Sequence, residues 1–250
     1  MLPKTPSFRL DGKRAFVPGG SRGLGLGCAA ALAEAGAHVV IAARSEGPVQ
    51  DAAAQLNDAG FSAEGVAMDI TDLPALKGFL AGQTFDVLCN SAGLARHSSA
   101  LDASEADYDA VMDINVKAAY FMATEVARGM GPDGGSIMQI SSQMGHVGGI
   151  DRTVYCATKH AVEGMTKAMA IEWGPKKIRV NTICPTFIRT PLTEATFNNP
   201  ERLAWIQDKI KLPRVGEIED IMGAVQFLAS DASALVTGTS ILIDGGWTAG

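Results

Sequence analysis

The 250-residue chain suits one α/β domain or two small ones, and its hydrophobic fraction of 47% is enough for a substantial core. A formal net charge of −6 argues against nucleic acid or an anionic membrane as main partner, so basic groups placed locally must bind any anionic ligand. The sequence has neither a signal-peptide pattern nor an apolar stretch of membrane-spanning length. We therefore expect a cytoplasmic protein with a small-molecule ligand and no nucleic-acid or membrane partner.

Short β-branched runs alternate with longer stretches rich in Ala and Leu. Most of these runs are apolar without alternation, as in parallel strands that are covered on both faces. The predicted strands are residues 14–17, 38–43, 63–68, 86–89, 136–140, 179–183 and 240–243. The clearest predicted helices are residues 24–34, 104–128, 153–173 and 218–229. This order predicts a Rossmann-type, doubly wound parallel sheet of seven strands in a three-layer α/β/α fold.

No linker divides the chain, so we expect a single dinucleotide-binding and catalytic domain over residues 1–250. Residues 190–212 have no strand of their own and are interpreted as an insertion that covers the substrate. In doubly wound sheets, ligands bind at the carboxyl ends of the strands, so the chemistry is expected there.

Four cysteines, Cys28, Cys89, Cys156 and Cys184, are scattered without a C-x-x-C pair. Such spacing is typical of buried, reduced thiols. We predict no disulfide and no metal site.

The first strand runs into the glycine-rich segment FVPGGSRGLGLG, residues 16–27. Gly19, Gly23 and Gly25 allow a sharp turn and a close approach to a pyrophosphate at a helix N-terminus. No Gly-Lys-Ser/Thr follows, which excludes a Walker loop, and Cys28 breaks the commoner G-x-G-x-x-G spacing. A plain glycine-rich turn is the alternative. Pro18 precedes these glycines, and we expect it to stiffen the exit of the strand at some cost in inter-strand bonding.

The end of the second strand predicts the cofactor preference. An acidic residue there would bind a ribose 2′-hydroxyl, but the sequence has Ala43 followed by Arg44. A guanidinium pairs well with a 2′-phosphate, and Arg22 can join Arg44. NADP(H) is therefore favoured and NAD(H) remains possible; the alternative is that Arg44 merely faces solvent.

Tyr155 and Lys159 are four residues apart on a predicted helix, so they share one face, and Ser142 ends the fifth strand. An ammonium group one turn away stabilises an ionised phenol. Tyr155 could then exchange a proton with a substrate hydroxyl or carbonyl while Ser142 bonds the same oxygen.

Together these motifs resemble the short-chain dehydrogenase/reductase family of compact type, over essentially the whole chain. The motifs that match are GGSRGLG at 19–25, Asp69, NSAG at 90–93, Asn115, Ser142, Tyr155-x-x-x-Lys159, Pro185 and IDGGW at 243–247. The chain is similar to sugar-acid and polyol dehydrogenases of that family, such as gluconate 5-dehydrogenase. It departs from the pattern at Pro18, at Ser91 and at Thr186, where Thr, Asn and Gly are usual.

The resemblance implies a catalytic tetrad of Asn115, Ser142, Tyr155 and Lys159. In it, Tyr155 is the acid/base, Ser142 orients the reacting oxygen, Lys159 also holds the nicotinamide ribose, and Asn115 fixes a water in a proton relay. The cofactor contacts that it implies are Gly19, Ser21, Arg22, Gly23, Leu24, Gly25, Arg44, Asp69, Ile70, Asn90, Ala92, Gly93, Tyr155, Lys159, Pro185, Ile188 and Thr190. Two other functions on the same fold are disfavoured. A non-catalytic dinucleotide-binding sensor should have lost part of this tetrad, which is complete here, and an isomerase or epimerase usually has a longer chain with an added substrate domain.

The loops after strands four to six supply candidate substrate residues, namely Arg96, His97, Gln143, His146, Arg152 and Thr186. Two arginines and two histidines favour a sugar, sugar acid, polyol or keto acid, and solvated loop charge is the alternative. A 3-oxoacyl (carrier-protein) reductase or a broad carbonyl reductase stays open. The resemblance also implies a homotetramer, built by residues 104–128 and 153–173 with the last helix and strand.

Overall fold

A seven-stranded parallel sheet runs through the computed structural model, which describes residues 1–250. Its order is β3-β2-β1-β4-β5-β6-β7, so the predicted doubly wound, three-layer fold is confirmed. The strands are β1 (Arg14–Pro18), β2 (His38–Ala43), β3 (Ser62–Ala67), β4 (Val87–Asn90), β5 (Gly135–Ile140), β6 (Ile178–Pro185) and β7 (Ser240–Ile243). The chain reverses its direction of winding between β1 and β4, where doubly wound sheets open a crevice for ligands.

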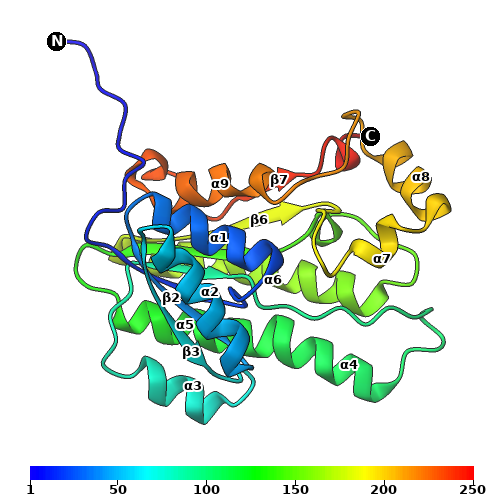
Figure 1. Cartoon of the computed structure of the whole chain (residues 1–250), viewed down its shortest axis with the longest axis horizontal. Coiled ribbons are helices and arrows are strands. Elements are labelled where there is room, and N and C mark those ends of the chain that lie inside the picture. The colour runs from blue at the N-terminus through cyan, green and yellow to red at the C-terminus, as the bar shows by residue number, and fades with distance from the viewer.

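Helices cover both faces of the sheet (Figure 1). One layer holds α1 (Gly23–Glu34), α2 (Glu46–Asp58) and α9 (Glu219–Ala229), and the other holds α3 (Leu73–Leu80), α5 (Ala119–Gly129) and α6 (Thr153–Trp173). Successive strand residues point to opposite faces, so Val17 packs under the first layer and Phe16 under the second. Both side chains are fully buried, and each such burial contributes about 1.5–3 kcal/mol.

Residues 190–212 contain no strand but two helices, α7 (Glu194–Phe197) and α8 (Pro200–Lys209). They project from one end of the molecule beyond β6 (Figure 1). Phe197, Ile206, Ile210 and Val215 form a small core of their own beneath these helices. The segment is therefore held by its own apolar contacts rather than by the main sheet.

The predicted helix over residues 104–128 begins as expected but is not continuous. Ser104 caps α4 (Glu105–Met112), because its hydroxyl accepts the Asp107 N–H at 3.1 Å. A π-helical segment, η1 (Asp113–Ala118), then separates α4 from α5. Short π segments of this kind are frequent at functional sites, and this one carries Asn115.

Pro18 forms the last residue of β1 and affects only one side of that strand. Its carbonyl accepts the Ser91 N–H at 3.0 Å, so the N–H that proline lacks is the one that would face β4. The register with β2 runs to Pro18, whereas the register with β4 covers only Ala15 and Phe16. The expected cost in inter-strand bonding therefore falls between β1 and β4.

All four cysteines are buried and unpaired. A hydrogen bond that the Cys89 thiol donates to Cys28, together with burial, raises the pKa of Cys89 well above its usual range. Cys28 and Cys89 pack as small apolar groups in the core beneath α1, whereas Cys184 contacts polar side chains.

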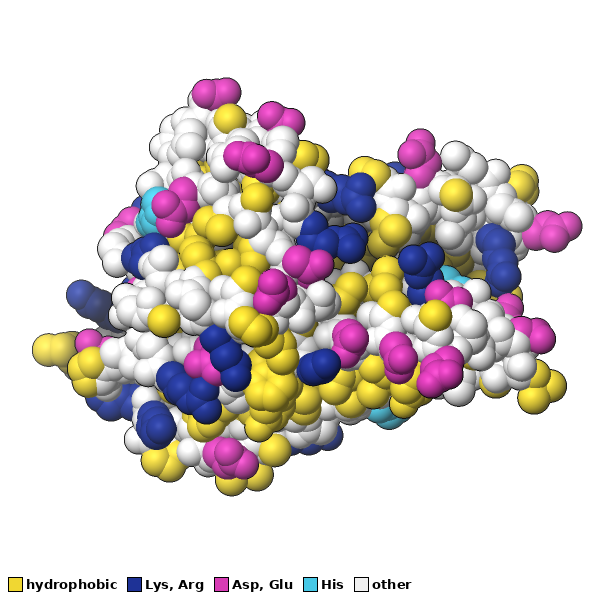
Figure 2. Space-filling model, turned by 90° about the horizontal axis from the view of Figure 1, so that it is seen from below, with side chains coloured by type: hydrophobic (Ala, Val, Ile, Leu, Met, Phe, Trp, Pro, Cys, Tyr) yellow, Lys and Arg dark blue, Asp and Glu magenta, His cyan; other side chains and the backbone are white.

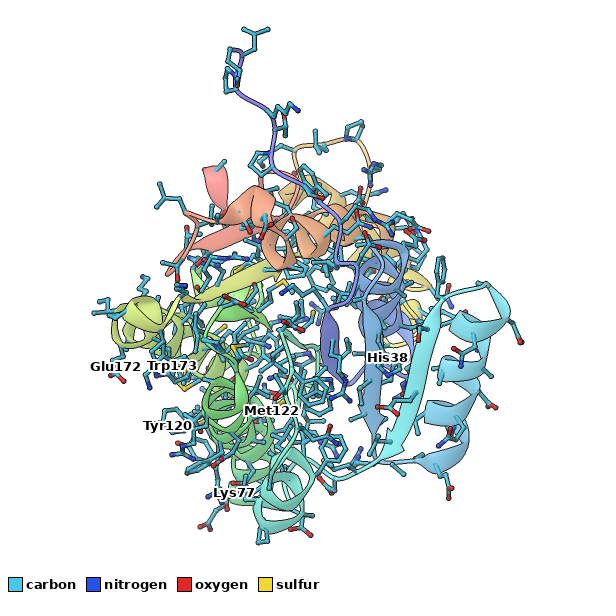
Figure 3. The ribbon with its side chains drawn as sticks, turned by 90° about the vertical axis from the view of Figure 1, so that its left-hand side faces the viewer. His38, Lys77, Tyr120, Met122, Glu172 and Trp173 are labelled. Atoms are coloured by element: carbon cyan, nitrogen blue, oxygen red, sulfur yellow. The ribbon has the colours of Figure 1, made fainter.

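Part of the helical surface is apolar. Hydrophobic side chains gather across the middle of the face that carries α3–α5 (Figure 2). In Figure 3, Tyr120 of α5 lies on the same outer side as Glu172 at the end of α6, while Met122 points inward.

None of the helices combines the length and the apolar character that crossing a membrane requires.

Candidate active site

A cleft of about 770 Å³ opens at the carboxyl ends of the strands. It brings together most of the predicted site residues from segments that are far apart in the chain. Those that line it are Gly19, Ser21, Arg22, Gly23, Leu24, Gly25, Arg44, Asp69, Ile70, Ala92, Gly93, His97, Ser142, Gln143, Arg152, Tyr155, Thr186 and Thr190.

The glycine-rich turn leaves no room for side chains at two positions. A Cβ on Gly19 would lie 2.6 Å from the Ala92 nitrogen, and one on Gly25 would lie 2.0 Å from the Gly19 carbonyl oxygen. Gly19 also has a φ of +76°, which disfavours other residues. The first-turn N–H groups of α1 have no partner within the helix, and no side chain caps them. The turn therefore fits a pyrophosphate, which the free amides and the helix N-terminus would bind.

Two cations flank this turn. Arg22 and Arg44 are exposed at the cleft, and their guanidinium groups take part in no hydrogen bond or ion pair within the protein. Asp69 lies near Arg44, but its carboxylate accepts the Thr71 N–H at 2.9 Å and the Thr71 hydroxyl at 2.7 Å. These two bonds, and then the Arg44 charge, lower the pKa of Asp69. The end of β2 thus presents unpaired positive charge, as a 2′-phosphate requires.

Ser142, Tyr155 and Lys159 meet beyond β5. The Lys159 ammonium donates to the Ile140 carbonyl at 2.9 Å and lies 5.5 Å from the centre of the Tyr155 ring. The Tyr155 side chain lines the cleft, and its hydroxyl has no hydrogen-bond partner within the protein. Ser142 accepts the Met144 N–H at 3.1 Å and donates to the Gln143 side-chain oxygen at 2.8 Å. Of these three side chains, only the Tyr155 phenol is left without a hydrogen bond within the protein.

Asn115 is buried behind these residues rather than in the cleft. Its side-chain oxygen accepts the Leu94 N–H at 2.8 Å, and its amide nitrogen donates to the Leu94 carbonyl at 2.9 Å and to the Thr158 hydroxyl at 3.1 Å. The Thr158 hydroxyl donates in turn to the Tyr155 carbonyl at 2.7 Å. Asn115 therefore ties the loop after β4 to the helix that carries Tyr155.

Asn90 has a similar position at the end of β4. Its amide nitrogen donates to the Gln139 side-chain oxygen at 2.7 Å, and its own side-chain oxygen accepts the Ala92 N–H at 3.1 Å. The side chain thus joins β4 to β5 and shapes the turn that leads to Gly93.

A polar cluster occupies the other end of the cleft. The Arg152 guanidinium donates to His97 Nε2 at 2.9 Å and stacks 5.3 Å from the Phe187 ring centre. Burial, followed by repulsion between the two groups, lowers the pKa of His97, and burial also lowers the pKa of Arg152. The Gln143 amide donates to the Thr186 hydroxyl at 3.2 Å. A guanidinium held in place in this way can bind a carboxylate or several hydroxyls.

Two of the predicted substrate residues lie outside the cleft. Arg96 faces the other way and pairs with Asp107 at 3.6 Å. His146 turns toward Cys184 and Glu163, behind the turn that follows β5. Loop composition alone does not define which way a side chain points, and the structure does not bring these two side chains to the cleft.

Two of the predicted cofactor residues, one at the end of β6 and one just after it, do not line the cleft either. Pro185 belongs to the strand itself, and Ile188 is buried and bridges to Gly216. Conversely, Phe187 lines the cleft although it was not predicted, and its place just after the sixth strand is the one signal that points to it.

Comparisons with known proteins agree with this geometry. The family model described as enoyl-(acyl carrier protein) reductase matches residues 19–248. The chain is 35% identical to L-xylulose reductase from Bos taurus, with coverage of 97% of this chain and 99% of the relative. It is 38% identical to galactitol 2-dehydrogenase from Rhizobium johnstonii, with coverage of 96% and 97%.

Solved structures show the same likeness. A gluconate 5-dehydrogenase from Burkholderia cenocepacia, in complex with NADP and tartrate, superimposes with a TM-score of 0.94 at 32% identity. The alignment covers 97% of this chain and 98% of that one. The chain belongs to the short-chain dehydrogenase/reductase family of oxidoreductases.

Proposed function

We propose that this oxidoreductase interconverts an alcohol and a carbonyl on a small polar substrate and prefers NADP(H) to NAD(H). The observation that carries the proposal is the unpartnered Tyr155 hydroxyl in the cleft, beside Lys159 and Ser142 and in one continuous space with the glycine-rich turn. A proton-transfer group thus shares its space with a site that fits a dinucleotide.

In this reaction Tyr155 gives a proton to the substrate oxygen or takes one from it. Lys159 stabilises the phenolate, because its ammonium lies close to the ring, and two of its three N–H groups remain for the nicotinamide ribose. Ser142 orients the same oxygen once its hydroxyl turns from Gln143 toward the substrate. A bound nicotinamide dinucleotide supplies or accepts the hydride.

The preference for NADP(H) rests on Arg44 and Arg22, which are exposed beside the turn and unpaired. A 2′-phosphate can form charge-assisted hydrogen bonds with both guanidinium groups. An acidic residue that would repel it is absent from the end of β2. The NADP in the Burkholderia gluconate 5-dehydrogenase supports the same choice.

The substrate that we propose is a sugar, sugar acid, polyol or keto acid. Arg152 and His97 place hydrogen-bonding groups and one positive charge beside Tyr155, and the His97 and Tyr155 ring centres are 6.1 Å apart. The names of the relatives, which include L-xylulose, galactitol and gluconate enzymes, support this class. An acyl group on a carrier protein is the second candidate, which only the description of the matching family model favours.

Tyr155→Phe tests the assignment of the acid/base. We expect turnover to fall to near background while the affinity for NADPH stays close to that of the wild type, because only the hydroxyl is removed. Tyr120→Phe, on the outer surface of α5, is the matched control and should leave both unchanged. Substrates are first found by screening sugars, sugar acids, polyols, keto acids and a 3-oxoacyl thioester with both cofactors. Undiminished turnover of Tyr155→Phe on the best substrate would contradict the proposal.

We also propose that residues 190–212 cover the bound substrate. Thr190, Pro191, Leu192, Thr193 and Thr196 line the cleft, although the segment packs mainly on its own small core. Protease cleavage within this segment should slow when cofactor and substrate are bound. A cleavage rate that ligands do not change would contradict this role.

Finally, we propose a homotetramer in the cytoplasm. Large apolar side chains are exposed on the helices that the resemblance assigns to the interface, among them Tyr108, Tyr120 and Ile171. The unpaired cysteines fit a reducing compartment. Light scattering after size-exclusion chromatography should give four chain masses, and Ile171→Glu should shift the protein to smaller species. A wild-type monomer would contradict the assembly.

A further inference from the structure

A second cluster of chemically active side chains lies behind the cleft. His146 follows the turn after β5, Glu163 lies in the middle of α6, and Cys184 lies near the end of β6. The Cys184 sulfur lies 3.4 Å from His146 Nε2 and 3.3 Å from Glu163 Oε1, and Nε2 lies 3.8 Å from Oε2. None of the three residues lines the cleft, and none has a role in the function proposed above.

We propose that His146, Glu163 and Cys184 bind a transition-metal ion, with Zn²⁺ as the preferred ion. In tetrahedral zinc sites the metal lies about 2.3 Å from sulfur and about 2.0–2.2 Å from nitrogen or oxygen. Those lengths place neighbouring ligand atoms roughly 3.3–3.6 Å apart. The sulfur–nitrogen separation of 3.4 Å lies in this range, and the two Glu163 oxygens lie 3.3 Å from the sulfur (Oε1) and 3.8 Å from the nitrogen (Oε2). The ion therefore fits with only small movements of the side chains.

The fourth position is supported by an independent observation. Ser141 is buried, and its hydroxyl has no hydrogen-bond partner. It lies beside the cluster, since a Cβ on Gly145 would lie 3.1 Å from both the Ser141 oxygen and Glu163 Cγ. The same hydroxyl lies near the Cys184 sulfur, close enough to lower the pKa of that thiol, although the two atoms do not reach hydrogen-bond geometry in the structure. A metal ion, or a water bound to it, would give this oxygen the partner that it lacks.

The ligand set also selects the kind of metal. Sulfur and imidazole ligands favour Zn²⁺ and Co²⁺, whereas Mg²⁺ and Ca²⁺ prefer oxygen. Two further hydroxyls hold the Glu163 carboxylate: Thr182 donates to it at 2.9 Å, and Ser240 donates to the same oxygen. Groups that orient a metal ligand in this way strengthen binding.

Binding forms a bond between the metal and sulfur and releases the thiol proton, with no redox change. Burial, and then the Glu163 charge, raises the pKa of Cys184 to about 12, so the thiol stays protonated until a metal displaces the proton. The proton and the ion can exchange with solvent at His146, whose side chain is 28% exposed. Without metal, the same three groups form a hydrogen-bonded cluster.

The position of the ion links it to the catalytic turn. His146 directly follows the turn Gln143–Gly145, whose cap is Ser142. Glu163 lies one helical turn beyond Lys159 on α6. A bound metal would therefore fix the turn that orients Ser142 against the helix that carries Lys159.

Cobalt titration tests the site on the complete protein, without nicotinamide, after treatment with a chelator. One equivalent of Co²⁺ should produce the near-ultraviolet absorption of a cobalt–thiolate bond, and Zn²⁺ should abolish it. Cys184→Ser should remove the band, while Cys28→Ala, at another buried thiol, should retain it.

A second variant avoids the risk that a change at buried Cys184 prevents folding. His146→Ala lies at the surface of the cluster and should weaken Co²⁺ binding at least about tenfold, as loss of a ligand or of its orienting partner does. His160→Ala, at an exposed histidine of α6, is its control and should bind as the wild type does. The proposal is wrong if the thiolate band does not form, if it persists in Cys184→Ser, or if His146→Ala binds Co²⁺ unchanged.

Discussion

Arg44→Ala provides the sharpest measure of how the cleft chooses its cofactor. The guanidinium lies at the end of β2 without a hydrogen bond or ion pair to the protein, so its removal breaks no such bond, and we expect the fold to stay intact. NADPH carries a 2′-phosphate, and NADH does not. The loss of binding free energy should therefore be confined to NADPH.

The size of the loss follows from the exposure of Arg44. A hydrogen bond to a charged group contributes about 1.5–3 kcal/mol, and an exposed one lies toward the lower end because water and salt screen it. A loss of about 1.5–2 kcal/mol corresponds to a Kd for NADPH that is about 10–30-fold higher. The Kd for NADH should change by no more than about twofold on the same arithmetic. Arg22 shares the phosphate, so the double variant should lose less than the sum of the two single variants.

Fluorescence titration of both reduced cofactors, at one fixed salt concentration, gives these constants directly. Arg128→Ala is the matched control, because Arg128 is exposed on α5 and paired with Glu125, away from the cleft. Raising the salt concentration should weaken NADPH binding in the wild type more than in Arg44→Ala. Equal weakening of both cofactors, or tighter binding of NADH than of NADPH by the wild type, would refute the reasoning.

Three further outcomes are expected. Gly25→Ala should abolish measurable cofactor binding, because the new Cβ would meet a backbone oxygen. The same overpacking should lower the free energy of unfolding by about 1–3 kcal/mol. Gly47→Ala is the control in the same titrations and thermal melts, since a Cβ there meets nothing within 4 Å. Asn115→Ala should lower the turnover, and it should also lower the free energy of unfolding by about 1–3 kcal/mol, because the buried backbone groups of Leu94 lose their partners. An unchanged Tm would contradict this and would indicate that Asn115 acts only by holding a water molecule. The pKa of His97 is lowered from 6.5 in the folded protein, so between these two pKa values the unfolded chain binds more protons than the folded one. Stability should therefore fall as the pH drops below about 6.5, and it should fall less in His97→Gln. Parallel curves of Tm against pH for the two proteins would contradict this.

The sheet and the glycine-rich turn were predictable because both depend on local patterns. Apolar runs without alternation indicate strands covered on both faces, and the order of strands and helices leaves few topologies. Once the sheet is assigned, Arg44 and Ser142 must lie at one edge, since each follows a strand.

The parts that were not predictable depend on contacts between distant segments. Arg96 and His97 are neighbours in one loop, yet one pairs with Asp107 outside the cleft and the other with Arg152 inside it. The cluster at Cys184 brings together His146, Glu163 and Cys184 from three separate segments, and their scattered spacing in the sequence gives no sign that they meet in space. The π-helical segment likewise could not be predicted from the local sequence. It occurs together with hydrogen bonds from Asn115 to the loop after β4, which is distant in the chain.

The wide turn at Asp113–Ala118 also bears on which changes of chain length the protein can tolerate. Each residue of an ordinary α-helix turns the chain by about 100°, so a deletion rotates one half of the helix against the other. A π turn already holds a surplus residue, and losing one there lets it close to α geometry while α4 and α5 keep the faces that they present. A deletion at this place would thus keep the faces of α4 and α5 and cost mainly the bonds that Asn115 makes to Leu94 and Thr158. A one-residue deletion in this segment would therefore lower activity more than it lowers the stability of the fold.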